Sequence, residues 1–220
     1  MNRRSIHLSA ISRVAAGALV CLLACRGADA RTATDFFVQA PDNVIGLIQK
    51  NSRLDMIDYF SGGLETPTAN AFDGKSRIEA ADDKRLVVAV SDRSRIEVAV
   101  VPLAKGDTAV AVIETVSTPA HDSSVALYRA RDWKPLPAVS PSMKDFMPRD
   151  AKSRGIGPAD MPPFLFISAE YDPSTQTFVF TNNTDSVYRA NDPARPKALE
   201  SMKKSIRRSF DGRKFISYGD

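Results

Sequence analysis

Residues 85–117 are the stretch of this sequence that most constrains its fold. Three apolar runs, rich in Val, Ile, Ala and Leu, are separated by two short polar turns, Ser91-Asp92-Arg93 and Lys105-Gly106-Asp107. Short apolar runs divided by turn residues are typical of an antiparallel meander. Both alternating sets of residues in each run are apolar, so the strands are predicted to be central and covered on both faces. The pattern predicts a fold and indicates no chemistry.

Residues 31–63, which precede the meander, are predicted to form two helices. In residues 31–40 the apolar side chains recur at helical spacing, and Pro41 disfavours continuation of the helix. Ser52-Arg53-Leu54-Asp55 has the form of a capping box, which predicts the start of a second helix, and Gly62-Gly63 predicts its end. The predicted buried faces are Ala33, Phe36, Phe37 and Ala40 in the first helix, and Leu54, Ile57 and Tyr59 or Phe60 in the second.

Residues 135–163 interrupt the regular pattern and hold seven of the 14 prolines. This composition predicts an extended crossing segment with one short helix near residues 142–147, and a crossing of this length usually covers part of the domain. After it, the pattern predicts a hairpin, then a helix opened by Asp192-Pro193, then a hairpin that turns at Asp211-Gly212. The predicted last helix carries Leu199, Met202 and Ile206.

The sequence therefore predicts one α+β domain over residues 31–220. Its centre is an antiparallel β-meander sheet packed by the N-terminal helices, and a hairpin–helix–hairpin unit follows the crossing segment. About 190 residues are enough for one domain with a sizeable core.

Residues 1–30 are predicted to be a secretory signal peptide. Basic residues precede an uncharged apolar run that is too short to span a bilayer, and Ala28-Asp29-Ala30 has the form of a cleavage site before Arg31. The alternative is a lipoprotein signal, because Leu22-Leu23-Ala24 precedes Cys25, the residue that would carry the lipid. Both interpretations predict export to the periplasm or the outer cell surface, with no transmembrane span in the mature chain.

Removal of this leader changes the charge and the cysteine content. The whole chain has 30 basic and 26 acidic residues, of which residues 1–30 hold four and one, so 26 and 25 remain. A nearly neutral mature chain gives no electrostatic reason to expect nucleic acid as a partner. Both cysteines, Cys21 and Cys25, lie in the leader, so the mature chain is predicted to have no disulfide and no thiolate metal site.

The mature chain offers few residues for catalysis, and no cofactor or metal is predicted. Its one histidine lies in His121-Asp122-Ser123, where neighbours in sequence point apart, which opposes a catalytic triad. One histidine without cysteine does not supply a zinc site, and neither Asp82-Asp83 nor Asp172 has the ligand spacing of a calcium loop. Carboxylates for glycoside hydrolysis have no sequence spacing to mark them. The candidates beside apolar strand residues, each expected at a solvated position, are Glu97, Glu114 and Glu170.

Trp133 is the only tryptophan and is interpreted as a structural anchor. It stands between Asp132 and Lys134 and is followed by prolines, where a large indole can cover the sheet edge and hold the crossing segment. The alternative interpretation is an exposed aromatic side chain that binds a partner.

Short motifs spread over the mature chain resemble those of a known family. They are Asp35-Phe36-Phe37, Pro41-Asp42, Asn51 to Tyr59, Asp122-Ser123, Asp132-Trp133-Lys134-Pro135-Leu136 and Asp211-Gly212-Arg213-Lys214-Phe215. In this order, around a meander, the chain resembles a family of small secreted proteins from Bacteroidales that is catalogued as a domain of unknown function. The resemblance implies an exported α+β protein and implies no activity and no catalytic residue.

The same resemblance implies a modification. Exported proteins of these bacteria are O-glycosylated at Ser or Thr between Asp and an apolar residue. Thr108 in Asp107-Thr108-Ala109 and Ser186 in Asp185-Ser186-Val187 have this form.

The absence of a catalytic motif favours a non-enzymatic exported protein that binds or supports a partner. The expected partner is an envelope protein or a glycan, bound at the sheet edge or at the crossing segment. The alternative is an exported hydrolase, for example one acting on glycans, whose carboxylates the sequence does not identify. No feature of the sequence indicates an oligomeric state.

Overall fold

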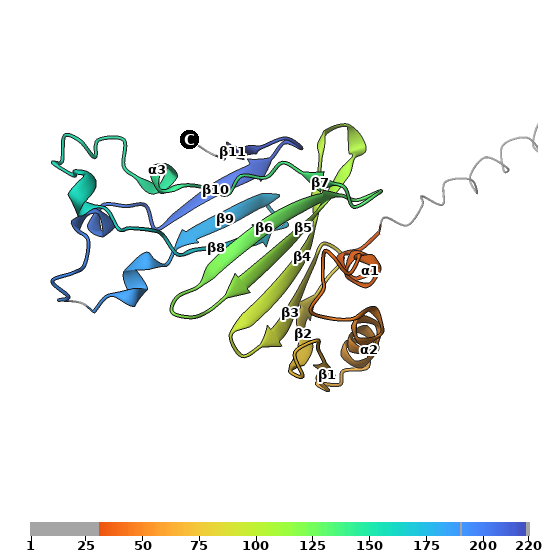
Figure 1. Ribbon diagram of the computed structural model, residues 1–220. Helices are drawn as coiled ribbons and strands as arrows, with labels where there is room; N and C mark the ends of the chain where they lie inside the picture. Colours follow the sequence, from red (N-terminus) through yellow and green to blue (C-terminus); the bar gives the residue numbers. More distant parts are fainter. Residues whose placement is uncertain (1–30, 190, 219–220) are drawn as a thin grey trace, which may run out of the picture. The chain divides into compact units, whose positions relative to one another are not determined.

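A computed structural model describes residues 31–189 and 191–218 of the chain. Two antiparallel sheets form its framework (Figure 1). The larger sheet has the strand order β1-β2-β3-β4-β5-β6-β7, and the smaller sheet has the order β11-β10-β9-β8. The predicted α+β class, built on an antiparallel meander, is confirmed.

The elements have the following bounds. The helices are α1 Ala33–Gln39, α2 Lys50–Ser61 and α3 Met143–Phe146. The strands of the larger sheet are β1 Thr68–Ala69, β2 Lys75–Ala81, β3 Arg85–Ser91, β4 Ser94–Pro102, β5 Thr108–Val116, β6 Asp122–Arg129 and β7 Pro135–Leu136. The strands of the smaller sheet are β8 Ile167–Asp172, β9 Thr177–Asn182, β10 Ser205–Phe210 and β11 Phe215–Ser217. Short 3₁₀ turns are η1 Ala104–Gly106, η2 Pro158–Asp160, η3 Thr184–Val187 and η4 Lys197–Glu200.

The meander strands contribute side chains to two separate cores, one on each face of the larger sheet. Alternate residues of a strand point to opposite faces, and apolar residues on both faces allow both to be covered. The first core joins the sheet to α1 and α2 and contains Phe36, Phe37, Ile45, Ile48, Met56, Leu86, Val88, Ile96, Val98, Val110 and Val112. The second core joins it to the smaller sheet and contains Ala99, Val101, Ala111, Ile113, Leu127, Phe146, Tyr171, Phe178, Phe180, Leu199, Ile206 and Phe210.

The helix α1 forms as its apolar spacing predicts. Thr32 caps its start, because the Thr32 hydroxyl accepts a hydrogen bond from the Asp35 N–H and the Asp35 carboxylate accepts one from the Thr32 N–H. Ala33, Phe36 and Phe37 are buried in the first core. The helix lies against β3 and β4 and covers the centre of the meander.

The prediction for α2 is wrong in two respects. The helix begins at Lys50, with Gln49 before it, so Ser52 and Asp55 lie inside the helix and form no capping box. Its buried residues are Arg53 and Met56, whereas the Leu54 side chain is 43% exposed.

The reason for this correction is a buried arginine. Arg53 Nη1 donates hydrogen bonds to the carbonyl oxygens of Phe37 and Ala40, 3.0 and 2.6 Å away, at the end of α1. Terminal helix carbonyls lack partners within their own helix, so a guanidinium that satisfies them can take an inner position. The neighbouring residue on a helix points about 100° away, and Leu54 therefore faces outward.

The predicted last helix is also wrong. A 3₁₀ turn, η4, replaces it, and Ile206 lies in β10 instead. Pro196 stands three residues after Pro193, and a proline inside a helix removes a hydrogen bond and clashes with the preceding turn. Leu199, Met202 and Ile206 are nevertheless all buried, each in the second core. The final hairpin forms between β10 and β11 as predicted.

The crossing segment, residues 135–163, lies on the second core. Its short helix α3 begins at Met143 after a capping box of Ser142 and Asp145, and Phe146 is fully buried. Apolar side chains from Leu136 to Met161 pack around that core. The segment therefore covers a packed apolar core.

Candidate functional site

The edge of the smaller sheet is closed by side chains from the larger sheet. Alternate residues of the edge strand β8 direct their backbone N–H groups away from β9, where another strand could bond to them. Three of these groups instead donate to side-chain oxygens: Ile167 to Asp122 Oδ1, Ala169 to Ser123 Oγ and Tyr171 to Glu97 Oε1, at 2.9, 3.0 and 2.9 Å. The N–H groups of these three residues are therefore not free to pair with another strand.

The edge of the larger sheet at β2 is open by contrast. Its neighbour β1 is two residues long and pairs only with Lys75 and Ser76. The ladder between the two strands ends at the pair Thr68 and Ser76, and Pro67 precedes it in the chain. The chain therefore leaves the sheet before Thr68, and β2 from Arg77 onward has a free side.

The backbone N–H and carbonyl groups of Ile78 face this free side. Asn70 donates its backbone N–H to the carbonyl oxygen of Gly74, which places the groups of Gly74 on the side of β1. Because the backbone groups of alternate residues in a strand face the same side, the N–H and carbonyl groups of Ser76 and Ile78 also face the side of β1. Among the described residues no backbone group outside the sheet bonds to Ile78.

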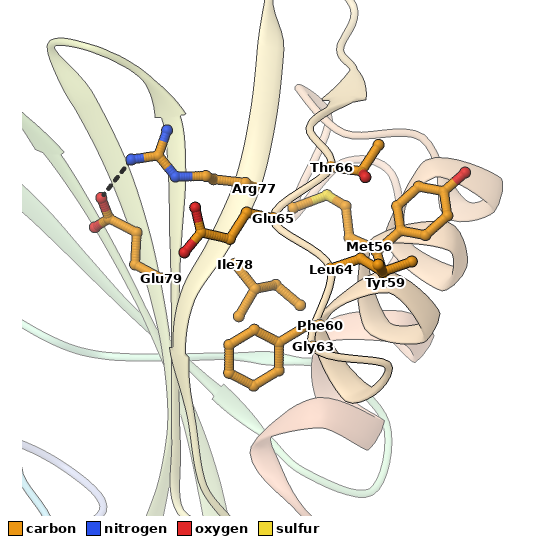
Figure 2. A pocket seen from close by; sticks show the side chains of 10 residues that line it. All are labelled: Met56, Tyr59, Phe60, Gly63, Leu64, Glu65, Thr66, Arg77, Ile78 and Glu79. Carbon is orange, nitrogen blue, oxygen red and sulfur yellow. Dashed lines mark ion pairs between the residues drawn. The ribbon is translucent and has the colours of Figure 1, made fainter.

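A groove of about 520 Å³ lies beside this free edge, between β2, α2 and the connection that leads to β1 (Figure 2). Its apolar lining includes Met56 and Phe60 of α2, Leu64 of the connection and Ile78 of β2. The Phe60 side chain is 39% exposed and that of Leu64 is 56% exposed. A groove that combines exposed apolar side chains with unpaired backbone can accept both the side chains and the main chain of an extended peptide.

The charged groups of the groove are only partly paired. Glu79 Oε2 lies 2.7 Å from Nε of Arg95, and Glu79 Oε1 lies 3.8 Å from Nη2 of Arg77. Glu65 extends from the connection toward β2 (Figure 2). In the described part of the chain its carboxylate forms no hydrogen bond and no ion pair. The groove therefore has one carboxylate, that of Glu65, without an ion-pair partner among the described residues.

A β-bulge limits how much of β2 another strand could pair with. The register of β2 against β3 shifts between Ile78 and Ala80. Bulges and charged edge residues such as Lys75 and Arg77 prevent indiscriminate pairing between sheets. The open edge is thus suited to a short segment and not to a long strand.

The carboxylates considered for hydrolysis do not meet in this groove. Glu114 and Glu170 are exposed on β5 and β8. Glu97 is 6% exposed, which contradicts the solvated position expected for it, and its Oε2 lies 2.7 Å from Nη2 of Arg85. Burial raises the pKa of the Glu97 carboxyl although Arg85 and the Tyr171 N–H favour its charged form. Its Oε1 accepts the hydrogen bond from the Tyr171 N–H and so joins the two sheets, and its Oε2 binds Arg85 of its own sheet.

The residues of the His121-Asp122-Ser123 row are directed to separate partners. His121 Nδ1 shares a hydrogen bond with Ser117 Oγ, 2.9 Å away, whereas Asp122 and Ser123 bond to β8. Among residues 31–189 and 191–218, no group of three or more histidines, cysteines or carboxylates is arranged to hold a metal ion. No helix in this part of the chain is long and apolar enough to cross a membrane.

Trp133 is half-buried at the margin of the first core. Its ring centroid lies 6.0 Å from that of Phe36 and 5.9 Å from that of Tyr128. It follows β6 and precedes the crossing segment, and it packs on α1 from there.

The two sites considered for O-glycosylation differ in their surroundings. Thr108 is half-buried at the first position of β5, and its carbonyl accepts a hydrogen bond from the Ala130 N–H. Ser186 is exposed in η3, where its hydroxyl donates to the Asn183 carbonyl, 2.7 Å away. Ser186 is the more accessible of the two.

Of the residues considered for signal processing, Cys25, Ala28 and Ala30 lie outside the described residues. Arg31 is described. Its guanidinium lies 4.3 Å from the centroid of the Phe36 ring and donates hydrogen bonds to Gln39 Oε1 and to the Ala130 carbonyl. These contacts hold the residue before the cap of α1 against the domain.

Sequence reasoning did not find the groove, because no motif marks it. The helical spacing predicts Tyr59 or Phe60 on the buried face, and Leu64 and Glu65 carry no periodic pattern. The one available signal was Pro67, which can end a ladder but identifies an open edge only once the strand beside it is known.

Comparison with known proteins gives a family and a fold. The family model described as "Protein of unknown function (DUF3256)" matches residues 26–215. No curated protein matches the chain. A solved structure of a domain of an uncharacterized protein from Porphyromonas gingivalis W83 is similar, with a TM-score of 0.67 and 15% identity, over 87% of this chain and all of that one. At this identity the likeness shows the fold alone. The chain thus belongs to the DUF3256 family, whose function is unknown, as the resemblance in its motifs indicated.

Proposed function

We propose that this protein is an exported, non-enzymatic binding protein of the periplasm or outer cell surface, and that it docks an extended segment of another polypeptide on the free edge of β2. The observation that carries the proposal is the open ladder position at Ile78, which lies beside a groove with exposed apolar side chains at Phe60 and Leu64. The predicted leader of residues 1–30 supports export.

Strand addition uses two kinds of contact, and the groove offers both. Main-chain hydrogen bonds to an edge strand supply affinity, and pockets for alternate side chains supply specificity. Ile78 supplies the N–H and the carbonyl, and Phe60 and Leu64 supply an exposed apolar surface. A glycan would leave the Ile78 backbone groups without their natural ladder partner, so a polypeptide fits the groove better.

The contrast between the two edges supports the same choice. The N–H groups of β8 are bonded to Asp122, Ser123 and Glu97, so that edge is protected. At β2, no side chain among the described residues caps the backbone groups of Ile78, and the solvent-exposed Leu64 lies nearby. Unpaired edges are costly unless they serve a partner, because they invite unwanted pairing.

Site-specific photocrosslinking in the native envelope tests the proposal. A photoreactive phenylalanine analogue at position 64 is expected to give an adduct with one polypeptide of defined mass. The same analogue at Val139, which is exposed on the crossing segment, is the matched control and is expected to give none. The adduct at position 64 should also disappear when Phe60→Ser removes part of the apolar lining. Equal labelling from both positions would remove the proposal.

An exported hydrolase is the alternative, and two carboxylates, those of Glu65 and Glu79, line the groove. Glu79 is held by Arg95 and Arg77, so it is engaged as a charged partner. Glycosidases use one carboxyl as a proton donor, a role that two adjacent arginines oppose. Hydrolysis of envelope glycans that is lost in both Glu65→Gln and Glu79→Gln would establish the alternative.

A further inference from the structure

The groove also indicates which polypeptide segment it accepts. We infer that the occupant is a short segment that runs antiparallel to β2 and carries an apolar residue opposite Ile78, flanked by basic residues. The inference rests on the proposed function, because it assigns the chemistry of the partner at the same groove.

The direction and the limit of the segment follow from β1. β1 pairs antiparallel with β2 at Lys75 and Ser76, so an antiparallel occupant would lie in line with β1 and continue its ladder from Arg77 onward. Residues facing one another in this pairing can exchange both hydrogen bonds, which Ile78 is positioned to do. Thr68 and Pro67 close the ladder at one end, so the segment ends or turns away there.

The apolar anchor follows from the direction of the Ile78 side chain. Ile78 points into the first core, on the face that α2 covers, together with Met56. A residue directly opposite in an antiparallel pair points to the same face, about 5 Å away. Its side chain would therefore enter the groove against Phe60 and Leu64, the two lining residues whose apolar surface is exposed.

The basic flanks follow from the charges of the lining. Glu79 has Arg95 at 2.7 Å and Arg77 at 3.8 Å, whereas Glu65 has no ion-pair partner among the described residues. Arg77 and Arg95 are engaged with Glu79, so a positive side chain that reaches Glu65 would give this carboxylate a partner, whereas a negative one would be repelled by it. Charge complementarity of this kind mainly sets specificity.

Synthetic peptides bound to the full-length protein provide the test, with fluorescence anisotropy as the readout. The probe is fluorescein-labelled Thr-Ser-Lys-Leu-Lys-Ser-Thr with blocked ends. Its matched relatives carry Glu in place of both Lys, Ser in place of Leu, or an N-methyl group on the Leu nitrogen. We expect the Lys form to bind about tenfold more tightly than the Glu form, since attraction at one carboxylate changes to repulsion. The Ser and N-methyl forms should bind at least as weakly as the Glu form.

Variants of the protein locate the effect. Glu65→Lys is expected to reverse the preference, so that the Glu peptide binds more tightly than the Lys peptide. Asp58→Lys makes the same charge change on the exposed side of α2, outside the groove lining, and should leave the preference unchanged. Both residues are exposed, so neither variant is expected to unfold the domain.

The outcomes separate this inference from the proposed function. Equal binding of the Lys and Glu peptides, no binding of either, or an unchanged preference in Glu65→Lys would overturn the inference. In each of those cases a crosslink from position 64 to a polypeptide would leave the proposed function standing. Absence of that crosslink as well would remove both.

Discussion

The carboxylate of Glu97 on β4 accepts a 2.9 Å hydrogen bond from the backbone N–H of Tyr171 on β8, and this contact joins the two sheets. Glu97 also forms an ion pair with Arg85, whose Nη2 lies 2.7 Å from Glu97 Oε2. With Asp122 and Ser123 it closes the β8 edge of the smaller sheet, whereas the larger sheet has an open edge at β2 beside a groove.

Removal of the Glu97 carboxylate should weaken the domain. Glu97→Ala leaves the Tyr171 N–H and Arg85 without their buried partner, at an expected cost of about 3–5 kcal/mol in the free energy of unfolding. Glu97→Gln keeps an oxygen acceptor and should cost clearly less. The control is Glu114→Ala, an exposed carboxylate on β5, with an expected change within about 0.5 kcal/mol. Urea denaturation measures all three, and equal values for Glu97→Ala and Glu114→Ala would contradict this role.

Tyr171 should make stability fall at high pH. Burial raises the pKa of Tyr171 from 10.0 to about 12. Because the folded pKa lies above the unfolded one, the neutral phenol favours the folded state, and this contribution is lost as pH rises from 10 toward 12. The hydroxyl is buried with no hydrogen-bond partner among the described residues. Tyr171→Phe is therefore expected to raise stability at pH 7 by about 1 kcal/mol, and to weaken its decline above pH 10. A parallel decline in both proteins would show that Tyr171 is not its cause.

Arg53 should contribute far more to the stability of the domain than Asp42, with which it forms an ion pair. Arg53→Ala removes the donors to the buried carbonyls of Phe37 and Ala40, and we expect a loss of about 3 kcal/mol. Asp42 is 85% exposed, and exposed ion pairs contribute little, so Asp42→Asn should cost less than about 0.5 kcal/mol. Thermal unfolding of the two variants gives the comparison. Similar losses would mean that the ion pair, and not the contact with α1, holds the guanidinium.

Trp133→Ala should destabilise the domain moderately. The indole is half-buried against Phe36 and Tyr128, so we expect about 2–3 kcal/mol, below the range of about 3–5 kcal/mol that is typical of a fully buried aromatic. Tyr218→Ala, an exposed aromatic on another element, is the control. An unchanged melting midpoint in Trp133→Ala would favour a role in binding.

Local patterns predicted the parts of the fold that local residues determine. The alternation in residues 85–117 gave the two faces of the meander correctly, because each strand fills both faces with apolar side chains. The apolar spacing of α1 was likewise sufficient. For α2 the pattern failed because Arg53 satisfies carbonyls 13 and 16 residues earlier, a contact that periodicity does not reveal.

The candidate site depends on relationships between distant segments. The Asp122 and Ser123 side chains cap amides 45 and 46 residues further along the chain, and the open edge at Ile78 exists because the ladder between β1 and β2 ends at Thr68. Turn and strand residues indicated where each element lies, but no single-sequence pattern states which edge is covered. The exposed Phe60 and Leu64 could be recognised only after the helix was placed on the sheet.

Hydrogen exchange of the Ile78 amide, measured by NMR with and without the Lys-Leu-Lys peptide, tests the central claim most directly. In the free protein this amide should exchange quickly, whereas the Tyr171 amide, bonded to Glu97, should exchange slowly. Addition of the peptide should slow exchange at Ile78 and leave Tyr171 unchanged. An Ile78 amide that is already protected in the free protein, or that does not respond to a bound peptide, would contradict strand addition at β2.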